Sequence, residues 1–289
     1  MYTDIIDKYA TIIIVLPLEK YPQFNEIQKP LHGFLNHTKK KIINMIDHSS
    51  KLANAFKEES YEHRDALHII LGCEILSTFP KYYVVYQFEQ LVAKQDWIEK
   101  GLLHKSVLDN YYEQLRNAVE VWDYAFNNIQ HLHEKAQINA KYVPFKYSPC
   151  MVYPKKVKDI DVCWIGNTAE RRKYIIDSLQ NEFKAYKTVN CVFGNNDIWN
   201  NDEPRVGPIV DLKSDVVART KIALNIHIHE PRVSSLEVVR ILYLLANGCK
   251  VVSEPSGDVE TDKLYEKMGV VFCDWEDMPK KCMELLFTL

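Results

Sequence analysis

Residues 221–254 read KIALNIHIHEPRVSSLEVVRILYLLANGCKVVSE, and the spacing of the apolar residues changes twice within them. The residues before Pro231 alternate between apolar and polar side chains, which is the period of a β-strand. This alternation places Asn225, His227 and His229 on one face of the predicted strand. Because proline cannot continue a regular strand, we expect a loop to begin at Pro231.

A helix is predicted after this loop. Ser234 has a side chain suited to an N-cap, and Glu237 stands three residues later, which is the spacing of a capping box before an apolar run. Gly248 follows that run at the place where a C′ glycine ends a helix. The β-branched residues after Gly248 predict a second buried strand. The stretch is therefore interpreted as a βαβ unit.

Ionisable residues crowd into the turn between the first strand and the helix. In an open α/β sheet, ligands bind where the carboxyl end of a strand meets the next helix. The turn holds His227, His229, Glu230 and Arg232 within six residues. We interpret it as the binding site of a nucleotide-type ligand.

Three interpretations of these side chains remain open at the level of sequence. Alternate histidines on a strand project to one side and could bind a metal ion, although no third ligand stands at a suitable spacing. Alternatively, Arg232 and the protonatable histidines meet the negative charge of a diphosphate. In the third interpretation, His227 is a hydrogen-bonded core residue.

Composition narrows the class of protein. The chain has 289 residues, a net charge of −3 and seven scattered cysteines without a CxxC pair. The balanced charge disfavours a nucleic-acid partner bound through a strongly basic surface. The cysteine pattern indicates reduced thiols rather than a disulfide or zinc framework. Neither a signal peptide nor an integral membrane segment is predicted, so we expect a soluble, cytoplasmic protein.

Strands and helices are predicted to alternate along the whole chain. In the first half, strands are expected at 11–16, 67–72, 81–91, around Trp122 and at 141–145, with helices at 34–59, 104–117 and 127–136. In the second half, strands are expected at 159–166, 189–194 and 270–273, with helices at 168–180, 211–220, 261–269 and 277–287 and a polar loop at 195–207. This alternation is typical of parallel sheets covered by helices on both faces.

A linker is predicted at 148–159, where two prolines and a lysine run interrupt the periodicity. The chain is therefore predicted to be an α/β protein with domains at 1–150 and 151–289. We expect two Rossmann-like domains that face each other across a cleft.

Other candidate ligand-binding residues flank the predicted strands. Gly166 and Asn167 form a strand-to-helix turn, where exposed backbone amides favour an anion, and Arg171 follows in the helix. Glu237 could accept the hydroxyls of a ribose. Arg240, one helical turn later, could pair with Glu237 or Glu254.

The candidates for a general base lie in the first half of the chain. Glu89 lies near the carboxyl end of the predicted strand at 81–91, and Glu19 and His32 follow the first strand. Glu74 is a fourth candidate, and the residue pattern does not rank the four.

The order of these segments resembles a known class of enzyme. The segments YQFEQL, VWDYAFNNI, DIDVCWIGNTAERRKYII and LNIHIHEP…LEVVRILYLLANGCKVVSE look like those of two-domain GT-B glycosyltransferases. The chain is similar to the CgeB-like and group 1 transferases of bacteria and large DNA viruses. The resemblance covers about residues 80–289, and 225–254 is its most specific part.

The resemblance implies a hexosyl- or pentosyltransferase of glycan biosynthesis. The acceptor-side domain, 1–150, would bind a glycan or another hydroxyl acceptor, and the donor-binding domain, 151–289, would bind a nucleotide-sugar, with UDP rather than GDP. Glu237 would hold the ribose, the 230–236 loop with Ser234 would lie at the diphosphate, and Gly166 and Asn167 would form the turn beside the donor. The transferase would need no metal or other cofactor. It would act in the cytoplasm of a bacterial cell or of a virus-infected host cell.

Two alternatives belong to other functional classes. One is a non-catalytic nucleotide- or sugar-binding module that keeps the ligand site and lacks a base. The other is a metal hydrolase that uses the HIHE segment, 227–230.

Overall fold

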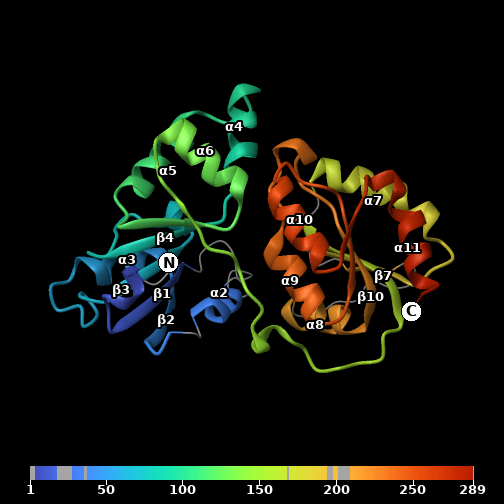
Figure 1. Ribbon diagram of the computed structural model, residues 1–289, viewed down its shortest axis with the longest axis horizontal. Coiled ribbons are helices and arrows are strands. Elements are labelled where there is room, and N and C mark those ends of the chain that lie inside the picture. The colour runs from blue at the N-terminus through green and yellow to red at the C-terminus, as the bar shows by residue number, and fades with distance from the viewer. Residues whose placement is uncertain are drawn as a thin grey trace. The chain divides into compact units, whose positions relative to one another are not determined.

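The computed structural model describes residues 4–17, 28–35, 38–167, 169–193, 198–200 and 209–288. The chain divides into two compact units, Met1–Lys146 and Tyr147–Leu289 (Figure 1). Both units are α/β, and each is built on a six-stranded sheet of mostly parallel strands. We refer to them as the amino unit and the carboxyl unit.

The sheet of the amino unit is fully parallel and has the order β2-β1-β3-β4-β5-β6. Its strands are β1 (Thr11–Pro17), β2 (Lys41–Asp47), β3 (Leu67–Leu71), β4 (Tyr83–Gln87), β5 (Glu120–Asp123) and β6 (Lys141–Tyr142). The helices are α1 (Asp4–Asp7), α2 (Gln28–Leu35), α3 (Ser49–Lys57), α4 (Leu91–Glu99), α5 (Ser106–Arg116) and α6 (Phe126–Ala136).

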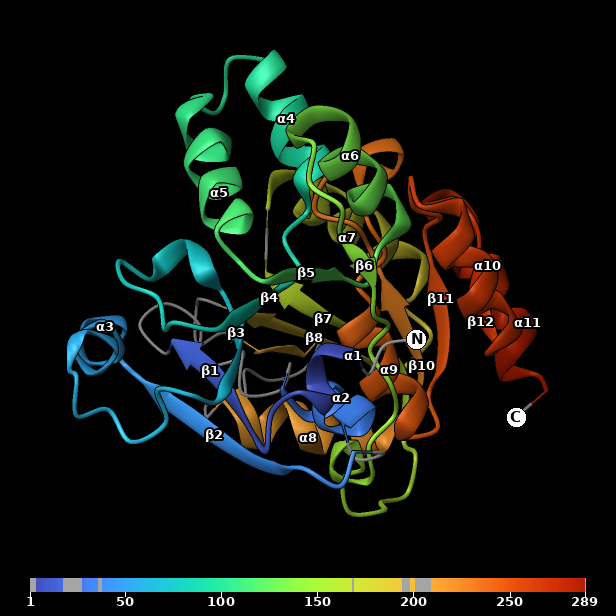
Figure 2. The ribbon, with the colours of Figure 1, turned by 60° about the vertical axis from the view of Figure 1, so that its left-hand side comes forward.

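The central strands of this sheet are buried, and helices cover both faces. The side chains of β1, β3 and β4 are almost fully shielded from water, as their β-branched and aromatic content predicts. Residues of α3, α5 and α6 share one core cluster with β1, β3, β4 and β5. Figures 1 and 2 show α4, α5 and α6 on the opposite side of this sheet from α2.

The prediction of one or two helices over about 34–59 was wrong in its middle part. Residues 41–47 form the edge strand β2, which pairs in parallel with β1, and only 49–57 are helical. Most side chains of β2 are half-buried because an edge strand has one neighbour only. The apolar residues of β2 (Ile42, Ile43, Met45 and Ile46) are spaced as they would be on one face of a helix. Pairing with β1 makes this segment a strand in spite of that spacing.

A buried histidine in β3 makes the stability of the amino unit depend on pH. Burial lowers the pKa of His68 to about 4, although the carbonyl groups of Tyr82 and Ala66 oppose the shift. The unfolded chain takes up a proton near pH 6.5, whereas the folded chain does so only near pH 4. The contribution of His68 to stability is thus present above pH 6.5 and is lost as the pH falls to 4.

We expect the free energy of unfolding to fall by up to about 3 kcal/mol between pH 7 and pH 4 through this histidine. Urea unfolding at a series of pH values measures the slope. A His68→Leu variant, which cannot titrate, should lose that part of the slope. An identical pH dependence in both proteins would contradict the assignment.

The sheet of the carboxyl unit has the order β12-β11-β10-β7-β8-β9 and is parallel except for β9. Its strands are β7 (Ile160–Asn167), β8 (Thr188–Phe193), β9 (Ile198–Asn200), β10 (Thr220–Asn225), β11 (Lys250–Ser253) and β12 (Val270–Phe272). The helices are α7 (Glu170–Glu182), α8 (Ile209–Arg219), α9 (Val238–Ala246), α10 (Val259–Lys267) and α11 (Met278–Leu286).

Helices cover both faces of this sheet, as predicted. Figure 1 shows α7 and α11 on one side of the sheet and α8, α9 and α10 on the other. Residues of α7 and α11 share one apolar cluster with β7, β10 and β11. In the part of the chain that the structure describes, no helix is long and apolar enough to cross a membrane.

The predicted polar loop at 195–207 contains an unpredicted strand. Residues 198–200 form β9, which pairs antiparallel with β8 at the edge of the sheet. A strand of three residues is too short to show an alternating pattern in the sequence. The remaining residues of this predicted loop lie outside the described part of the chain.

Candidate functional site

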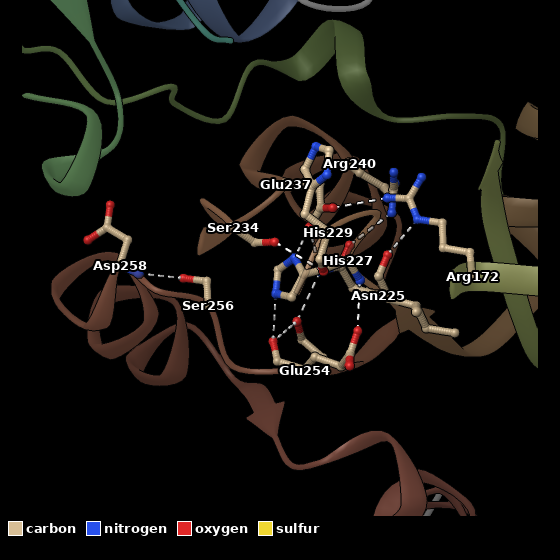
Figure 3. A network of polar contacts seen from close by, with 12 residues as sticks. Arg172, Asn225, His227, His229, Ser234, Glu237, Arg240, Glu254, Ser256 and Asp258 are labelled. Carbon is tan, nitrogen blue, oxygen red and sulfur yellow. Dashed lines mark hydrogen bonds and ion pairs between the residues drawn. The ribbon is translucent and has the colours of Figure 1, made fainter. Parts of the chain in front are cut away.

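A network of charged and polar side chains lies at the carboxyl ends of β10 and β11 (Figure 3). Asn225 ends β10, and Glu254 follows directly after β11. The first turn of α7 contributes Arg171 and Arg172, whose side chains reach the same place. This edge of a parallel sheet is where α/β proteins bind ligands.

The chain leaves the strand earlier and enters the helix later than the sequence predicted. Strand β10 ends at Asn225, so His227 and His229 lie in the following loop and not on a strand face. Pro231 begins a 3-10 turn, and α9 begins only at Val238. The Ser234 hydroxyl donates to the carbonyl oxygens of His229 and Glu230, at 3.3 and 3.0 Å. The predicted capping box is therefore wrong, because Ser234 closes the turn instead.

Glu237 lies at the centre of the network. It occupies the N-cap position of α9 without capping the helix. Its carboxylate lies 2.8 Å from His227 Nδ1, and it accepts hydrogen bonds from Arg172 and from Asn225 Nδ2, both at 3.0 Å. Burial alone would raise the pKa of Glu237, but His227, Arg240 and Arg172 lower it below its usual value. Glu237 is thus a buried carboxylate that nearby cations keep ionised.

Glu254 is a second buried carboxylate, and its side chain is 2 % exposed. Arg171 donates to both of its oxygens, at 2.9 and 2.5 Å, in the bidentate geometry that gives strong ion pairs. The backbone N–H of His227 donates to the same carboxylate at 2.8 Å. Glu254 therefore ties α7 and the loop after β10 to the end of β11.

The two nitrogens of the His227 ring both face oxygen acceptors. Nδ1 lies 2.8 Å from the Glu237 carboxylate, and Nε2 lies 3.2 Å from the backbone carbonyl of Glu254. Nδ1 is at ion-pair distance from the Glu237 carboxylate, but among the described residues it has no hydrogen-bond partner of good geometry. Burial alone would lower the pKa of His227, but Glu237 and Glu254 raise it overall. The two carboxylates therefore favour the protonated form of the His227 ring.

Two more arginines complete the cationic character of this edge. Arg172 is 3 % exposed, and its Nε donates to the carbonyl of Ile226 at 2.9 Å. Burial next to Arg240 lowers the pKa of Arg172 to about 10, so it stays charged at neutral pH. Arg240 donates to Asn225 Oδ1 at 3.0 Å, and Asn225 donates to Ser253 at 3.0 Å.

The remaining predicted ligand residues lie around this network. Glu230 has a side chain that is 60 % exposed and lies 3.6 Å from Arg171, and Arg232 is exposed. His229 is half-buried. A Cβ atom at Gly166 would lie 2.8 Å from the ring of Trp164, so this glycine leaves room for that ring. Asn167 ends β7, and its side chain lies outside what the structure describes.

The predicted ligand residues included neither Asn225 nor Glu254, and Arg172 was considered beside Arg171 only as a residue that could balance a phosphate. In the structure Asn225 ends β10, Glu254 follows β11 and Arg172 lies in the first turn of α7, whereas the predicted strand continued past Asn225. Their mutual contacts were hidden because 83 residues separate Arg171 from Glu254. Arg171 was predicted to balance the charge of a phosphate. In the structure, its N–H groups donate to the Glu254 carboxylate and to the backbone carbonyl of His227.

The loop after β4 presents Glu89 at the carboxyl edge of the other sheet. The Glu89 carboxylate forms an ion pair with Lys94 at 2.7 Å and is 25 % exposed. The side chains of Gln87 and Asn128 donate to its backbone carbonyl at 3.1 and 2.9 Å. These two hydrogen bonds fix the backbone of the loop at Glu89.

A buried carboxylate that the sequence did not single out supports this loop. Asp123 ends β5, accepts from Gln87 Nε2 at 2.6 Å, and accepts from the backbone N–H of Ala125 at 2.8 Å. Burial raises the pKa of Asp123 well above its usual range, against the effect of these donors. Asp123 is fully buried, so it positions Gln87 rather than contacting solvent.

The other base candidates have different outcomes. Glu74 lies in the short turn after β3. Burial raises the pKa of Tyr111 well above its usual range, and the charges of Glu74 and Glu89 add to this shift. His32 lies on α2, where its Nε2 is 3.0 Å from Asn44 Oδ1 in the middle of β2. Glu19 lies outside the described residues. Among those that are described, no three His, Cys, Asp or Glu side chains are arranged to hold a metal ion.

Comparisons with known proteins show the fold. No family model and no curated protein matches the sequence. Among solved structures, the chain is similar to an α-glucosyltransferase in complex with UDP and a 13-mer DNA that contains a central A:G mismatch. The identity is 12 %, the TM-score is 0.54, and the match covers 96 % of this chain and 90 % of that one. The chain thus has an α/β fold with two sheets of mainly parallel strands, similar to that of a glycosyltransferase.

Proposed function

We propose that the protein is a glycosyltransferase that moves a sugar from a nucleoside-diphosphate sugar, with UDP as the nucleotide, to a hydroxyl acceptor. The observation that carries the proposal is the group of cationic side chains at the carboxyl ends of β10 and β11: Arg172 and His227 are buried, and Arg171 and Arg240 are half-buried. A fold similar to that of a UDP-bound glucosyltransferase supports the same assignment.

In this proposal, the acceptor oxygen attacks the anomeric carbon of the sugar while the bond from that carbon to the diphosphate breaks. A base of the amino unit takes the acceptor proton, and we propose Glu89 for this role. The leaving diphosphate takes the electron pair of the broken bond, and fixed positive charges stabilise it without a metal ion. Because Arg171 and Arg172 donate to protein oxygens, they act through their field, and Arg232 in the exposed loop would contact the diphosphate.

The contacts of Glu237 limit how many ribose hydroxyl groups its carboxylate could bind. A carboxylate has about four lone-pair sites, and three neighbours of Glu237 already use three of them. A ribose hydroxyl could therefore take one position at most while the network is intact.

The acceptor is proposed to be a glycan or another molecule with a free hydroxyl group. The solved structure contains DNA, so a DNA duplex belongs in the acceptor panel beside glycans. The net charge of −3 favours an uncharged acceptor over DNA. A non-catalytic binding module remains the second hypothesis, and it predicts binding of the nucleotide without turnover of the donor in any acceptor mixture.

Thermal unfolding in the presence of UDP, GDP and their sugars tests the donor site. A ligand at 100 times its Kd should stabilise the folded state by about 2.7 kcal/mol and raise the Tm accordingly. We expect UDP to give the largest shift, and Arg232→Ala to reduce it. Lys263→Ala, on the exposed face of α10, is the matched control and should leave the shift unchanged. The absence of a shift with every nucleotide would reject the donor site.

A further inference from the structure

A cavity lies in the amino unit, between the end of α3 and the chain that enters β4. It has a volume of about 220 Å³. Its walls combine aromatic rings with charged side chains, among them Phe56, Tyr61, Phe79, Lys57, Glu59 and Arg64. Neither the proposed donor site nor the candidate base uses any of these residues.

The cavity lies at the opposite edge of the sheet from Glu89. Arg64 precedes β3, and Phe79 precedes β4, so both residues stand at the amino ends of parallel strands. Glu89 and Asp123 stand at the carboxyl ends of the same sheet. A strand as short as β3 spans roughly 17 Å, so the two places are separate sites.

A buried histidine fixes the orientation of one aromatic wall. His68 Nδ1 faces the carbonyl oxygens of Ala66 and Tyr82 at 3.1 and 3.3 Å, so this nitrogen carries the proton. His68 Nε2 then accepts a hydrogen bond from the Tyr61 hydroxyl at 2.9 Å. The ring of Tyr61 is thus anchored from beneath.

The other rings are held in the same way. Phe56 packs edge-on against Tyr61 and against His68, with ring centroids 5.7 Å apart in both pairs. Phe79 stacks on Tyr83 at 4.9 Å. Phe56, Tyr61 and Phe79 are all half-buried, so each keeps part of its surface for a ligand. A wall that is rigid before binding loses little conformational entropy when a ligand arrives.

The rim of the cavity mixes both signs of charge. Besides Lys81, whose Nζ lies over the Tyr82 ring, the exposed charged residues of the rim are Lys57, Glu58, Glu59 and Arg64. Among the described residues, none of these four side chains forms an ion pair at salt-bridge distance. A mixed rim offers both donors and acceptors, which suits a neutral ligand with many hydroxyl groups better than an anion.

We propose that this cavity binds one sugar ring of a neutral glycan. The apolar face of the ring would pack on the aromatic wall, and the carboxylates and cations of the rim would hydrogen-bond its hydroxyl groups. The volume is smaller than that of pockets for drug-sized ligands, which fits a single ring. The inference is independent of sugar transfer, because binding at this edge requires neither a donor nor a base.

The experiment compares three proteins: the wild type, the double variant Glu59→Ala with Arg64→Ala, and the control Glu266→Ala with Lys267→Ala. The control removes one acid and one base from an exposed part of α10 and its end. A printed array of neutral glycans identifies the probe, and saturation-transfer NMR then measures its Kd. We expect a Kd on the order of 1 mM for one ring, and at least about tenfold weaker binding in the double variant alone.

Three results would overturn the proposal. In the first, the wild type binds no glycan of the array. In the second, the double variant binds as well as the wild type. In the third, inorganic phosphate displaces the sugar, which would show that the cavity selects anions. The UDP-dependent rise in Tm, measured on the same double variant, should remain. Loss of the sugar with an intact UDP response therefore separates this cavity from the donor site.

Discussion

Replacing Glu237 with glutamine should lower the free energy of unfolding by about 3–5 kcal/mol. Glutamine keeps the shape of the side chain but removes the charge that faces His227, Arg172 and Arg240. His227 and Arg172 are both buried, so water cannot replace the lost carboxylate. Removing one partner of a buried ion pair costs more than the pair contributes, because the other partner stays buried and uncompensated.

Urea unfolding of the purified variant measures this loss. The matched control is Glu230→Gln, which also removes one carboxylate from the same network. Glu230 is 60 % exposed and lies 3.6 Å from Arg171, so its removal should change stability by no more than about 0.5 kcal/mol. Equal losses in the two variants would mean that the buried network contributes nothing special to folding.

This expectation also limits how the donor site can be mapped. A Glu237 variant that no longer responds to UDP could have lost either a ribose contact or the network that shapes the site. Arg232 is exposed, so its replacement should cost less stability than the replacement of Glu237 and reports more directly on binding. The two variants together distinguish a direct contact from an indirect effect.

The buried strands of the fold could be predicted from the sequence, whereas two of the edge strands could not. Strands β10 and β11 coincide with runs of apolar and β-branched residues, and these runs predicted both strands. Strands β2 and β9 were missed, because the apolar residues of β2 are spaced as on a helix and β9 has only three residues, whereas the edge strands β6 and β12 were predicted. The side chains of β2 and β9 are set by pairing with β1 and β8, and a single sequence does not display such pairing.

The site shows the same division. The sequence located the turn with His227 and Glu237 because charged residues there interrupt an apolar pattern. It could not show that Arg172 reaches Glu237, since 65 residues separate the two. It also placed His229 on the strand face with His227, because the alternation of residues continues past the last paired residue, Asn225. Spacing along the chain thus identified the residues, and tertiary contacts set their roles.

The second large effect is expected at Glu89. If Glu89 is the general base of the proposed transfer, Glu89→Gln should lower kcat by about 100- to 10,000-fold. Glutamine cannot accept the acceptor proton, and the reaction would fall back on water. Stability should change little, because the loop is held by the backbone carbonyl of Glu89 and not by its carboxylate. The ion pair with Lys94 is partly exposed and contributes little to folding.

Steady-state kinetics with a UDP-sugar and an acceptor from the panel separate this role from a structural one. A base is needed for chemistry only, so KM for the donor and the UDP-dependent rise in Tm should stay close to the wild type. Lys94→Met is the informative comparison, because it removes the partner of Glu89 and leaves the carboxylate in place. Glu74→Gln tests the neighbouring candidate on the same edge. If Glu74→Gln loses activity and Glu89→Gln keeps it, the base is Glu74, in the turn after β3.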